Sequence, residues 1–325
     1  MAALPSARDN QNYVTVHALS SGFLTLPEHL FVEGAKEGDR KTVPSISFLI
    51  QHRDATTGEL ARIVFDMGIR KNLEKYPQML VAHLKSRQPL SSSPDVKDSL
   101  ELGGLKPQDI DFIFLSHVHW DHVGTPSDFP TSHFVVGHGA IDVLKSGGDP
   151  HKTGGHSHFE ADLLPEGRTT ELPSPDQDGV SGTVSGGTSV KKLPNAKWAP
   201  LAHFPAAIDL FGDGSVYIIN APGHLQGHIN LLARLGLKSW VYLGGDACHD
   251  RRLLRKEAGI AQWKGVDGQL CCIHIDKAKA EDTIDKIGTL EKMNGGEYKV
   301  EVVLAHDVEW LAREENKKRF WPGSL

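Results

Sequence analysis

The chain has 325 residues and a formal net charge of −6, with 39% hydrophobic and 23% charged residues. This composition supports a folded core but is too polar for a membrane protein, and no stretch approaches the ~18 apolar residues of a spanning helix. The net negative charge gives no support to nucleic-acid binding. The first thirty residues lack the apolar core of a secretory signal, and three cysteines cannot build a disulfide framework. The sequence therefore predicts a cytoplasmic protein that engages neither membranes nor nucleic acids.

Length alone would suggest two domains, but an α/β enzyme can take 325 residues as one. We predict a single domain over residues 1–325 with an insertion at about 147–200. Short apolar runs at 45–50 and 62–65 indicate strands in the N-terminal part. Residues 71–87 carry apolar side chains at three- and four-residue intervals, which is typical of a helix packed on a core.

Three histidines and one aspartate closely follow an apolar strand at 112–115, namely His117, His119, Asp121 and His122. A strand that ends in a sharp turn can aim His117 and His119 at one point and the other two side chains at a second point nearby. One short segment can therefore serve two metals. Imidazole and carboxylate without thiolate suit Zn²⁺, and Fe or Mn as well. Because the chain contains 18 histidines, a His-rich surface loop is the alternative, but this spacing behind a buried strand favours a metal site.

Three later apolar strands can supply the further ligands that a two-metal site needs, because each leads into a polar residue. They are expected at 215–220, 240–245 and 300–305. A polar residue at the carboxyl end of a buried strand is where α/β enzymes place their chemistry. Any one of these residues alone could be structural, but joined to the loop they complete a set of seven ligands. The residues at the three strand ends are His224, Asp246 and His306.

The C-terminal part repeats the alternation of strands and helices. A further strand is expected at 229–235, and helices at 250–258, 276–293 and 309–319. Both halves of the chain therefore alternate short strands with helices, as an α/β protein does.

These motifs resemble the metallo-β-lactamase superfamily, and within it the lactonase branch typified by N-acyl homoserine lactonases. The resemblance extends from Thr15 to about His306 and implies a four-layer αββα sandwich of the α/β class, with the metals in the seam between two sheets. The motifs that carry it are Phe65-Asp66-Met67-Gly68, the segment from Ser116 to Gly124, Ala221-Pro-Gly-His224 with Gly227-His228, Gly244-Gly245-Asp246 and Ala305-His306.

The resemblance also implies two Zn²⁺ ions per chain and a role for each ligand. Asp66 would hold a ligand imidazole in one tautomer, a role that some nearby group has to fill. His228 is expected to be a packing residue and not a ligand. Residue by residue, the first ion would take His117, His119 and His224, the second would take Asp121, His122 and His306, and Asp246 would bridge the two.

The chain departs from the lactonase pattern three residues after the bridging aspartate, where that branch commonly has a tyrosine and this chain has His249. An imidazole there can donate a hydrogen bond to the substrate or protonate a leaving group. A structural role, capping the helix that begins near Asp250, is an equal alternative. Cys248 lies next to it in the sequence, and although a thiolate ligand is conceivable, a small buried hydrophobic residue is expected.

The predicted insertion at 147–200 is rich in glycine, proline and serine and poor in apolar residues. A loop of this length is commonly functional, and we interpret it as a lid over the metal cleft. His151, His156 and His158 could form a third metal site, but solvent-exposed histidines in a loop are the preferred interpretation. Walls of the substrate pocket, or else core residues, are expected at Phe23, Leu24, Trp120 and Trp198.

The expected chemistry is hydrolysis by a hydroxide held between two metals, because coordination lowers the pKa of water to about 7. Asp121 would orient the hydroxide and take up its proton as the hydroxide attacks a carbonyl carbon. The sequence thus predicts a zinc-dependent hydrolase that opens a small cyclic ester (lactone) or a cyclic amide or carbamate (lactam), with a xenobiotic or signalling compound as substrate.

A thioesterase or phosphodiesterase of the same fold is the first alternative. A mononuclear iron dioxygenase would keep fewer ligands, and a non-catalytic binding protein would lose some of them. All seven ligand positions are filled in this chain, which favours the two-metal hydrolase.

Overall fold

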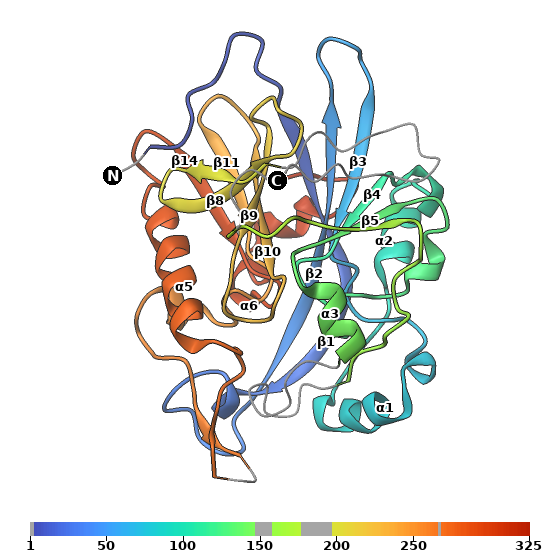
Figure 1. Ribbon diagram of the computed structural model, residues 1–325, viewed down its shortest axis with the longest axis vertical. Helices are drawn as coiled ribbons and strands as arrows, with labels where there is room; N and C mark the ends of the chain where they lie inside the picture. The colour runs from blue at the N-terminus through green and yellow to red at the C-terminus, as the bar shows by residue number, and fades with distance from the viewer. Residues whose placement is uncertain (1–2, 147–157, 177–196, 266–267) are drawn as a thin grey trace.

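The strands of this fold send alternate side chains into two different apolar layers. Val241 and Leu243 point into the layer between two facing sheets, while Trp240 and Tyr242 point to the outer face of the second sheet. This period of two is that of a strand covered on both sides. Figure 1 shows the two sheets face to face, with helices on the outside. The computed structural model describes residues 3–146, 158–176, 197–265 and 268–325.

The first sheet has the strand order β1-β2-β3-β4-β5-β6. Its first three strands pair antiparallel, and its strands from β3 to β6 pair parallel. The polar loops that follow β3 and β4 therefore leave the sheet at the same edge. The strands are β1 (Val14–Pro27), β2 (Arg40–Arg53), β3 (Leu60–Phe65), β4 (Phe112–Phe114), β5 (His133–Val136) and β6 (Thr169–Glu171).

The second sheet has the order β14-β11-β10-β9-β8-β7. β14 and β11 pair parallel, and the other neighbours pair antiparallel. A separate two-stranded ribbon is formed by β12 (Trp263–Lys264) and β13 (Leu270–Cys271). The strands of the second sheet are β7 (Ala199–Leu201), β8 (Phe204–Asp209), β9 (Val216–Asn220), β10 (Ile229–Arg234), β11 (Ser239–Leu243) and β14 (Lys299–Val303).

Helices cover the outer face of each sheet. Residues of α2 and α3 pack with the outward side chains of the first sheet, and residues of α4 and α5 pack with those of the second. The result is the predicted four-layer αββα sandwich, so the expectation from the sequence is confirmed. The helices are α1 (Gln78–Leu84), α2 (Val96–Leu102), α3 (Ala140–Ser146), α4 (Arg251–Leu254), α5 (Lys277–Glu291) and α6 (Val308–Leu311).

Aspartates begin several of these helices. Asp95 accepts a hydrogen bond from the backbone of α2, Asp276 from α5 and Asp250 from α4. Such a cap satisfies a backbone N–H that has no partner inside the helix. The cap of α4 is therefore Asp250, and the alternative that His249 caps this helix is wrong.

The predicted strands are confirmed within a few residues, but three predicted helices are too long. Tyr76 is extended, with φ −70° and ψ 154°, because it precedes Pro77, and this breaks the helix expected over 71–87. Only α1 and two short 3₁₀ turns remain of that helix. The helix expected at 250–258 ends at Leu254, and the one at 309–319 is interrupted after Leu311.

Two of the sequence predictions concern segments that the structure describes only in part. The lid proposed over 147–200, with His151 and His156, lies mainly outside the described residues, and for those residues it stays a prediction. The described residues 169–171 form β6 of the first sheet, and 199–201 form β7 of the second, so these parts of the predicted insertion belong to the sandwich. His158 is described, and its ring lies 5.7 Å from that of His83. No helix within the described ranges is long and apolar enough to cross a membrane.

A buried ion pair joins the helices outside the second sheet. Arg251, at the start of α4, donates to Asp307 with 2.6 Å between Nη2 and Oδ2, and to Glu291 of α5 with 2.7 Å between Nη1 and Oε1. Both side chains of the Arg251–Asp307 pair are at most 5% exposed. The two carboxylates, acting against burial, raise the pKa of Arg251. Removing one partner leaves an uncompensated buried charge.

We expect Asp307→Asn to lower the free energy of unfolding by about 3 kcal/mol, because it leaves Arg251 with a weaker partner in a buried place. The measurement is urea denaturation followed by circular dichroism. Glu309→Gln is the matched control, since Glu309 pairs with Arg255 where each side chain is 41% exposed, and a change below about 1 kcal/mol is expected there. Equal decreases in the free energy of unfolding for the two variants would contradict the larger contribution of the buried ion pair.

Candidate metal centre

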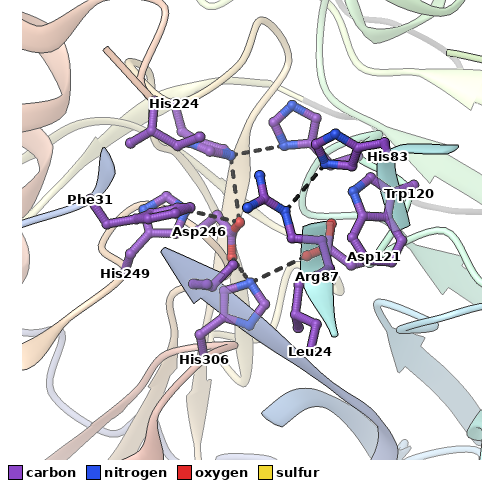
Figure 2. A pocket seen from close by; sticks show the side chains of 13 residues that line it. Leu24, Phe31, His83, Arg87, Trp120, Asp121, His224, Asp246, His249 and His306 are labelled. Atoms are coloured by element: carbon purple, nitrogen blue, oxygen red, sulfur yellow. Dashed lines mark hydrogen bonds and ion pairs between the residues drawn. The ribbon is translucent and has the colours of Figure 1, made fainter. Parts of the chain in front are cut away.

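The candidate site lies where loops from both sheets meet, at the carboxyl ends of their strands (Figure 2). The loops after β4, β9, β11 and β14 supply its histidines and aspartates. All seven predicted ligands are at most 7% exposed, and the structure brings them together. They are His117, His119, Asp121, His122, His224, Asp246 and His306.

Three imidazoles form a first group. His119 Nδ1 lies 2.8 Å from His117 Nε2 and 3.0 Å from His224 Nε2. A ring nitrogen has one proton or one lone pair, so His119 Nδ1 cannot form good hydrogen bonds with both neighbours. A metal ion can accept the lone pairs of all three nitrogens at once. This group is therefore a candidate site for a divalent metal.

A second group lies beside it and contains Asp121, His122 and His306. One ligand atom from each lies within 4.8 Å of the others, and all three side chains are buried. His306 Nε2 is 3.6 Å from Asp121 Oδ2. Imidazole and carboxylate in this proportion again suit a divalent transition metal.

Asp246 connects the two groups. Its Oδ1 lies 3.1 Å from His122 Nε2 and 3.2 Å from His306 Nε2, while its Oδ2 lies 3.5 Å from His224 Nε2 and 3.8 Å from His117 Nε2. Each oxygen thus faces one group. Asp246 Oδ1 and His122 Nε2 are buried without a hydrogen-bond partner in the described part of the chain, which is the arrangement expected of atoms that would share a metal.

Asp66 fixes the outer side of this cluster. Its Oδ2 accepts from His122 Nδ1 at 2.9 Å and from the Ser116 hydroxyl at 2.7 Å. Since that hydroxyl donates to Asp66, its oxygen is free to accept from His117 Nδ1, 3.0 Å away. Both imidazoles then carry their proton on Nδ1 and present the Nε2 lone pair to the site. The contact predicted for Asp66 is present.

The pKa of each histidine in the site depends on its burial and on its distance from a carboxylate. Burial lowers the pKa of His117 and His224 well below the usual range. Burial acts the same way on His122, but the Asp246 carboxylate outweighs it and raises that pKa well above the usual range. The pKa of His306 is also raised, for the same reason. A metal bound to these two imidazoles would have to displace protons, so its affinity would rise with pH.

Glycines allow two of the ligand loops to turn sharply. Gly223 has φ 127°, and a Cβ there would lie 2.3 Å from the backbone nitrogen of Ala280 in α5. Only glycine can make this close approach, which brings His224 against the start of that helix. Gly245 has φ 47° and precedes Asp246 directly. These two glycine turns let His224 and Asp246 turn toward the site within a few residues of the ends of their strands.

A pocket opens over the candidate ligands (Figure 2). Leu24 and Trp120 line it, as predicted for its walls. Phe23 and Trp198 do not: Phe23 pairs with Ser91, and Trp198 packs against the layer between the sheets. The lining residues are Leu24, Leu26, Phe31, His83, Arg87, His119, Trp120, Asp121, His224, Asp246, His249, Ile273 and His306.

Sequence reasoning did not select several lining residues. Arg87 follows Leu80 and Leu84 at helical spacing. A charged residue among apolar residues on one helix face was the signal that could have indicated a functional role. Phe31 and Ile273 come from segments with no such pattern. His274 lies just outside the pocket, with its ring 5.0 Å from that of His224, and nothing in its local sequence marks it.

The residues beside the ligands have distinct surroundings. His249 lines the pocket, with its Nε2 3.2 Å from Asp246 Oδ2. His228 Nε2 accepts from the backbone N–H of Asp246 at 3.2 Å, as a packing residue does. Cys248 is fully buried, and burial raises the pKa of its thiol to about 12. The interpretation of Cys248 as a small hydrophobic residue is therefore confirmed.

The chain belongs to the metallo-beta-lactamase superfamily, whose family model matches residues 62–236. A solved N-acyl homoserine lactone hydrolase, with the product N-hexanoyl-L-homoserine at its catalytic metal centre, superposes with a TM-score of 0.62 at 16% identity. The match covers 96% of this chain and 98% of that one. Both the fold and the resemblance expected from the motifs are confirmed.

Fungal proteins are similar to the chain in sequence. The cytochrome P450 monooxygenase mpaDE' of Penicillium brevicompactum is 29% identical over 98% of this chain and 38% of that protein. The gamma-lactamase FDB1 of Fusarium pseudograminearum is 30% identical over 74% of this chain and 54% of that protein. The chain therefore spans well under two thirds of the length of these relatives.

We expect Asp66→Asn to weaken metal binding by about 10- to 100-fold, because the amide no longer holds the His122 tautomer with a negative charge. Zinc affinity measured against a competing chelator tests this. Asp95→Asn, the same change at a buried helix cap, is the control and should leave the affinity unchanged. If Asp66→Asn binds zinc as tightly as the wild type, Asp66 has only a structural role.

Proposed function

We propose that this protein is a dinuclear metal-dependent hydrolase that opens a small cyclic ester or cyclic amide. The observation that carries the proposal is the position of Asp246, whose two carboxylate oxygens face two separate groups of buried ligands. A mononuclear site has no use for the second group. Membership of the metallo-beta-lactamase superfamily supports the same chemistry.

The proposal assigns two ions to the two groups. His117, His119 and His224 would hold one, and Asp121, His122 and His306 would hold the other, with Asp246 bridging. The ions would lower the pKa of a shared water toward about 7 and polarise the substrate carbonyl. We propose Zn²⁺ for both because of the histidine-rich ligands, with Fe or Mn as alternatives.

The chain's own side chains would manage the protons. Asp121 borders the pocket, so its carboxylate can orient the attacking water and accept a proton from it. The water oxygen then bonds to the carbonyl carbon, and the ring C–O or C–N bond breaks. His249 lines the pocket, with its Nε2 3.2 Å from Asp246 Oδ2, and can give a proton to the leaving atom. An amide nitrogen needs this proton more than an ester oxygen does.

The substrate class follows from the chemistry and from the relatives. FDB1 is a gamma-lactamase, and the solved structural neighbour is a lactone hydrolase. We therefore propose a lactone or a lactam, including a cyclic carbamate, as the small-molecule substrate. A cytoplasmic location and a single domain over residues 1–325 complete the proposal.

We expect Asp246→Ala to abolish turnover and to lower the metal content, since it removes the carboxylate proposed to touch both ions. Metal analysis of the zinc-loaded protein and a lactone hydrolysis assay measure the two effects. Asp282→Ala, which removes an exposed carboxylate, is the control. Near-normal activity with two bound ions would exclude the bridge, and a wild-type protein with one iron or no metal would contradict the dinuclear hydrolase itself.

We expect His249→Ala to reduce kcat by about 10²- to 10⁴-fold for a γ-lactam, and clearly less for the lactone of the same ring size. The reason is that only the amide nitrogen depends on a proton donor. Metal stoichiometry should not change. His133→Ala, which removes a buried imidazole from β5 on the first sheet, is the matched control. Small and equal losses on both substrates would mean that His249 does not act as the proton donor.

A further inference from the structure

Arg87 is a charged residue in the wall of the pocket. It ends the 3₁₀ turn Lys85–Arg87 that directly follows α1, and it is only 6% exposed. Figure 2 shows its side chain extending from the side of His83 and Trp120 across the pocket toward Asp246. Its guanidinium group therefore shares the pocket with the proposed metal ligands.

The described residues leave the terminal nitrogens of this guanidinium without a partner. Nε of Arg87 donates to His83 Nε2 at 3.2 Å. Within the part of the chain that the structure describes, Nη1 and Nη2 have no hydrogen-bond or ion-pair partner, and neither nitrogen is enclosed by protein. The outer edge of the guanidinium, with its two parallel N–H donors, is thus presented to the pocket.

The other buried arginines of the described residues differ from Arg87. Arg70 donates to Glu160 at 2.9 Å, and Arg251 donates to Asp307 at 2.6 Å. Arg234 donates to backbone carbonyl oxygens. A buried cation without an anionic or carbonyl partner is costly. Among the described residues, Arg87 is therefore the buried arginine whose terminal nitrogens are available to an anionic ligand in the pocket.

The surroundings of Arg87 hold it in place for such a partner. Burial lowers the pKa of His83 to about 4, so this imidazole is neutral at pH 7 and accepts the hydrogen bond from Arg87. The ring of His83 packs edge-on against Trp120 at 6.4 Å. Asp121 acts on Arg87 through its charge, but this carboxylate belongs to the proposed ligand groups and is committed there.

We infer that Arg87 binds a carboxylate of the substrate, so that this enzyme acts on a lactone or lactam that carries an acid group beside its ring. The planar fork of an arginine matches the two oxygens of a carboxylate. With the ring carbonyl over the metal ligands, the acid group would lie against the wall formed by Arg87 and Trp120. The inference rests on the proposed function for the identity of the ring but not for the recognition of the acid.

Two lactones of the same ring size test the inference: 5-oxotetrahydrofuran-2-carboxylate, which carries the acid, and γ-valerolactone, which carries a methyl group instead. The zinc-loaded wild type should prefer the acid. Arg87→Gln should raise KM for the acid by about 10- to 100-fold, and change KM for γ-valerolactone far less. Arg87→Lys keeps the positive charge but not the planar fork of two N–H donors, so its KM for the acid should lie between those of the wild type and Arg87→Gln. Arg53→Gln, in the exposed part of β2, is the matched control.

A binding measurement separates this inference from the proposed function. Tetrahydrofuran-2-carboxylate has no scissile ring carbonyl, and calorimetry should detect its binding to the wild type and to Arg53→Gln but not to Arg87→Gln. If this difference is found while neither lactone is hydrolysed, the proposed function fails and the acid site stands. A wild type without preference for the acid lactone, or equal KM changes for both lactones in Arg87→Gln, overturns the inference. If Arg87→Gln does not fold, the wild-type preference and Arg87→Lys decide the question.

Discussion

The structure depends on one crowded electrostatic contact, the carboxylate of Asp246 among imidazoles from both sheets. Nitrogens of the surrounding histidines lie 3.1–3.8 Å from its oxygens, and none of these side chains is more than 7% exposed. Such a cluster is largely shielded from water, so most of its charge has to balance within the protein or with bound ions. The sheets can close over it only if this balance holds. The packing of the two sheets and the charge balance of the site therefore depend on each other.

The parts of the site that could be read from the sequence are those that local patterns define. His117, His119 and His122 lie within one short loop. His224 and His306 follow the ends of strands, and an apolar run that stops at a polar residue can be recognised from the sequence alone. The α/β class followed from the alternation of strands and helices, whereas the four-layer sandwich followed from the resemblance to the metallo-β-lactamase superfamily. Arg87 could not be assigned in this way, because the sequence does not show that its terminal nitrogens face the pocket without a partner among the described residues. The helix expected over 71–87 failed because one proline outweighed a regular apolar pattern.

The proposed metal ligands and the proposed recognition residue Arg87 belong to different parts of the molecule. The candidate ligands lie at the ends of buried strands, where the backbone is held by two sheets. Part of the opposite wall is built from α1 and the 3₁₀ turn after it, with His83 and Arg87, while Leu24 of β1 and Trp120 of the ligand loop complete it. The side chains of α1 and of this turn can change without disturbing the strands. A superfamily that keeps one metal chemistry can thus serve many substrates, because the specificity residues are not part of the sandwich core.

The loop from Ser116 to Gly124 is tied down by its own backbone. The Met67 N–H donates to the carbonyl of His122 at 2.7 Å, the Gly124 N–H donates to that of Gly68 at 2.9 Å, and the Ile229 N–H of the second sheet donates to that of Ser116 at 2.8 Å. These three bonds restrain the backbone of the loop, so an ion that binds there would meet ligands that are already held in place. A rigid cage selects an ion by its size and preferred geometry, whereas a flexible one adapts to whichever ion is abundant. In the proposed metal site, selectivity would therefore depend on the backbone as much as on the histidines.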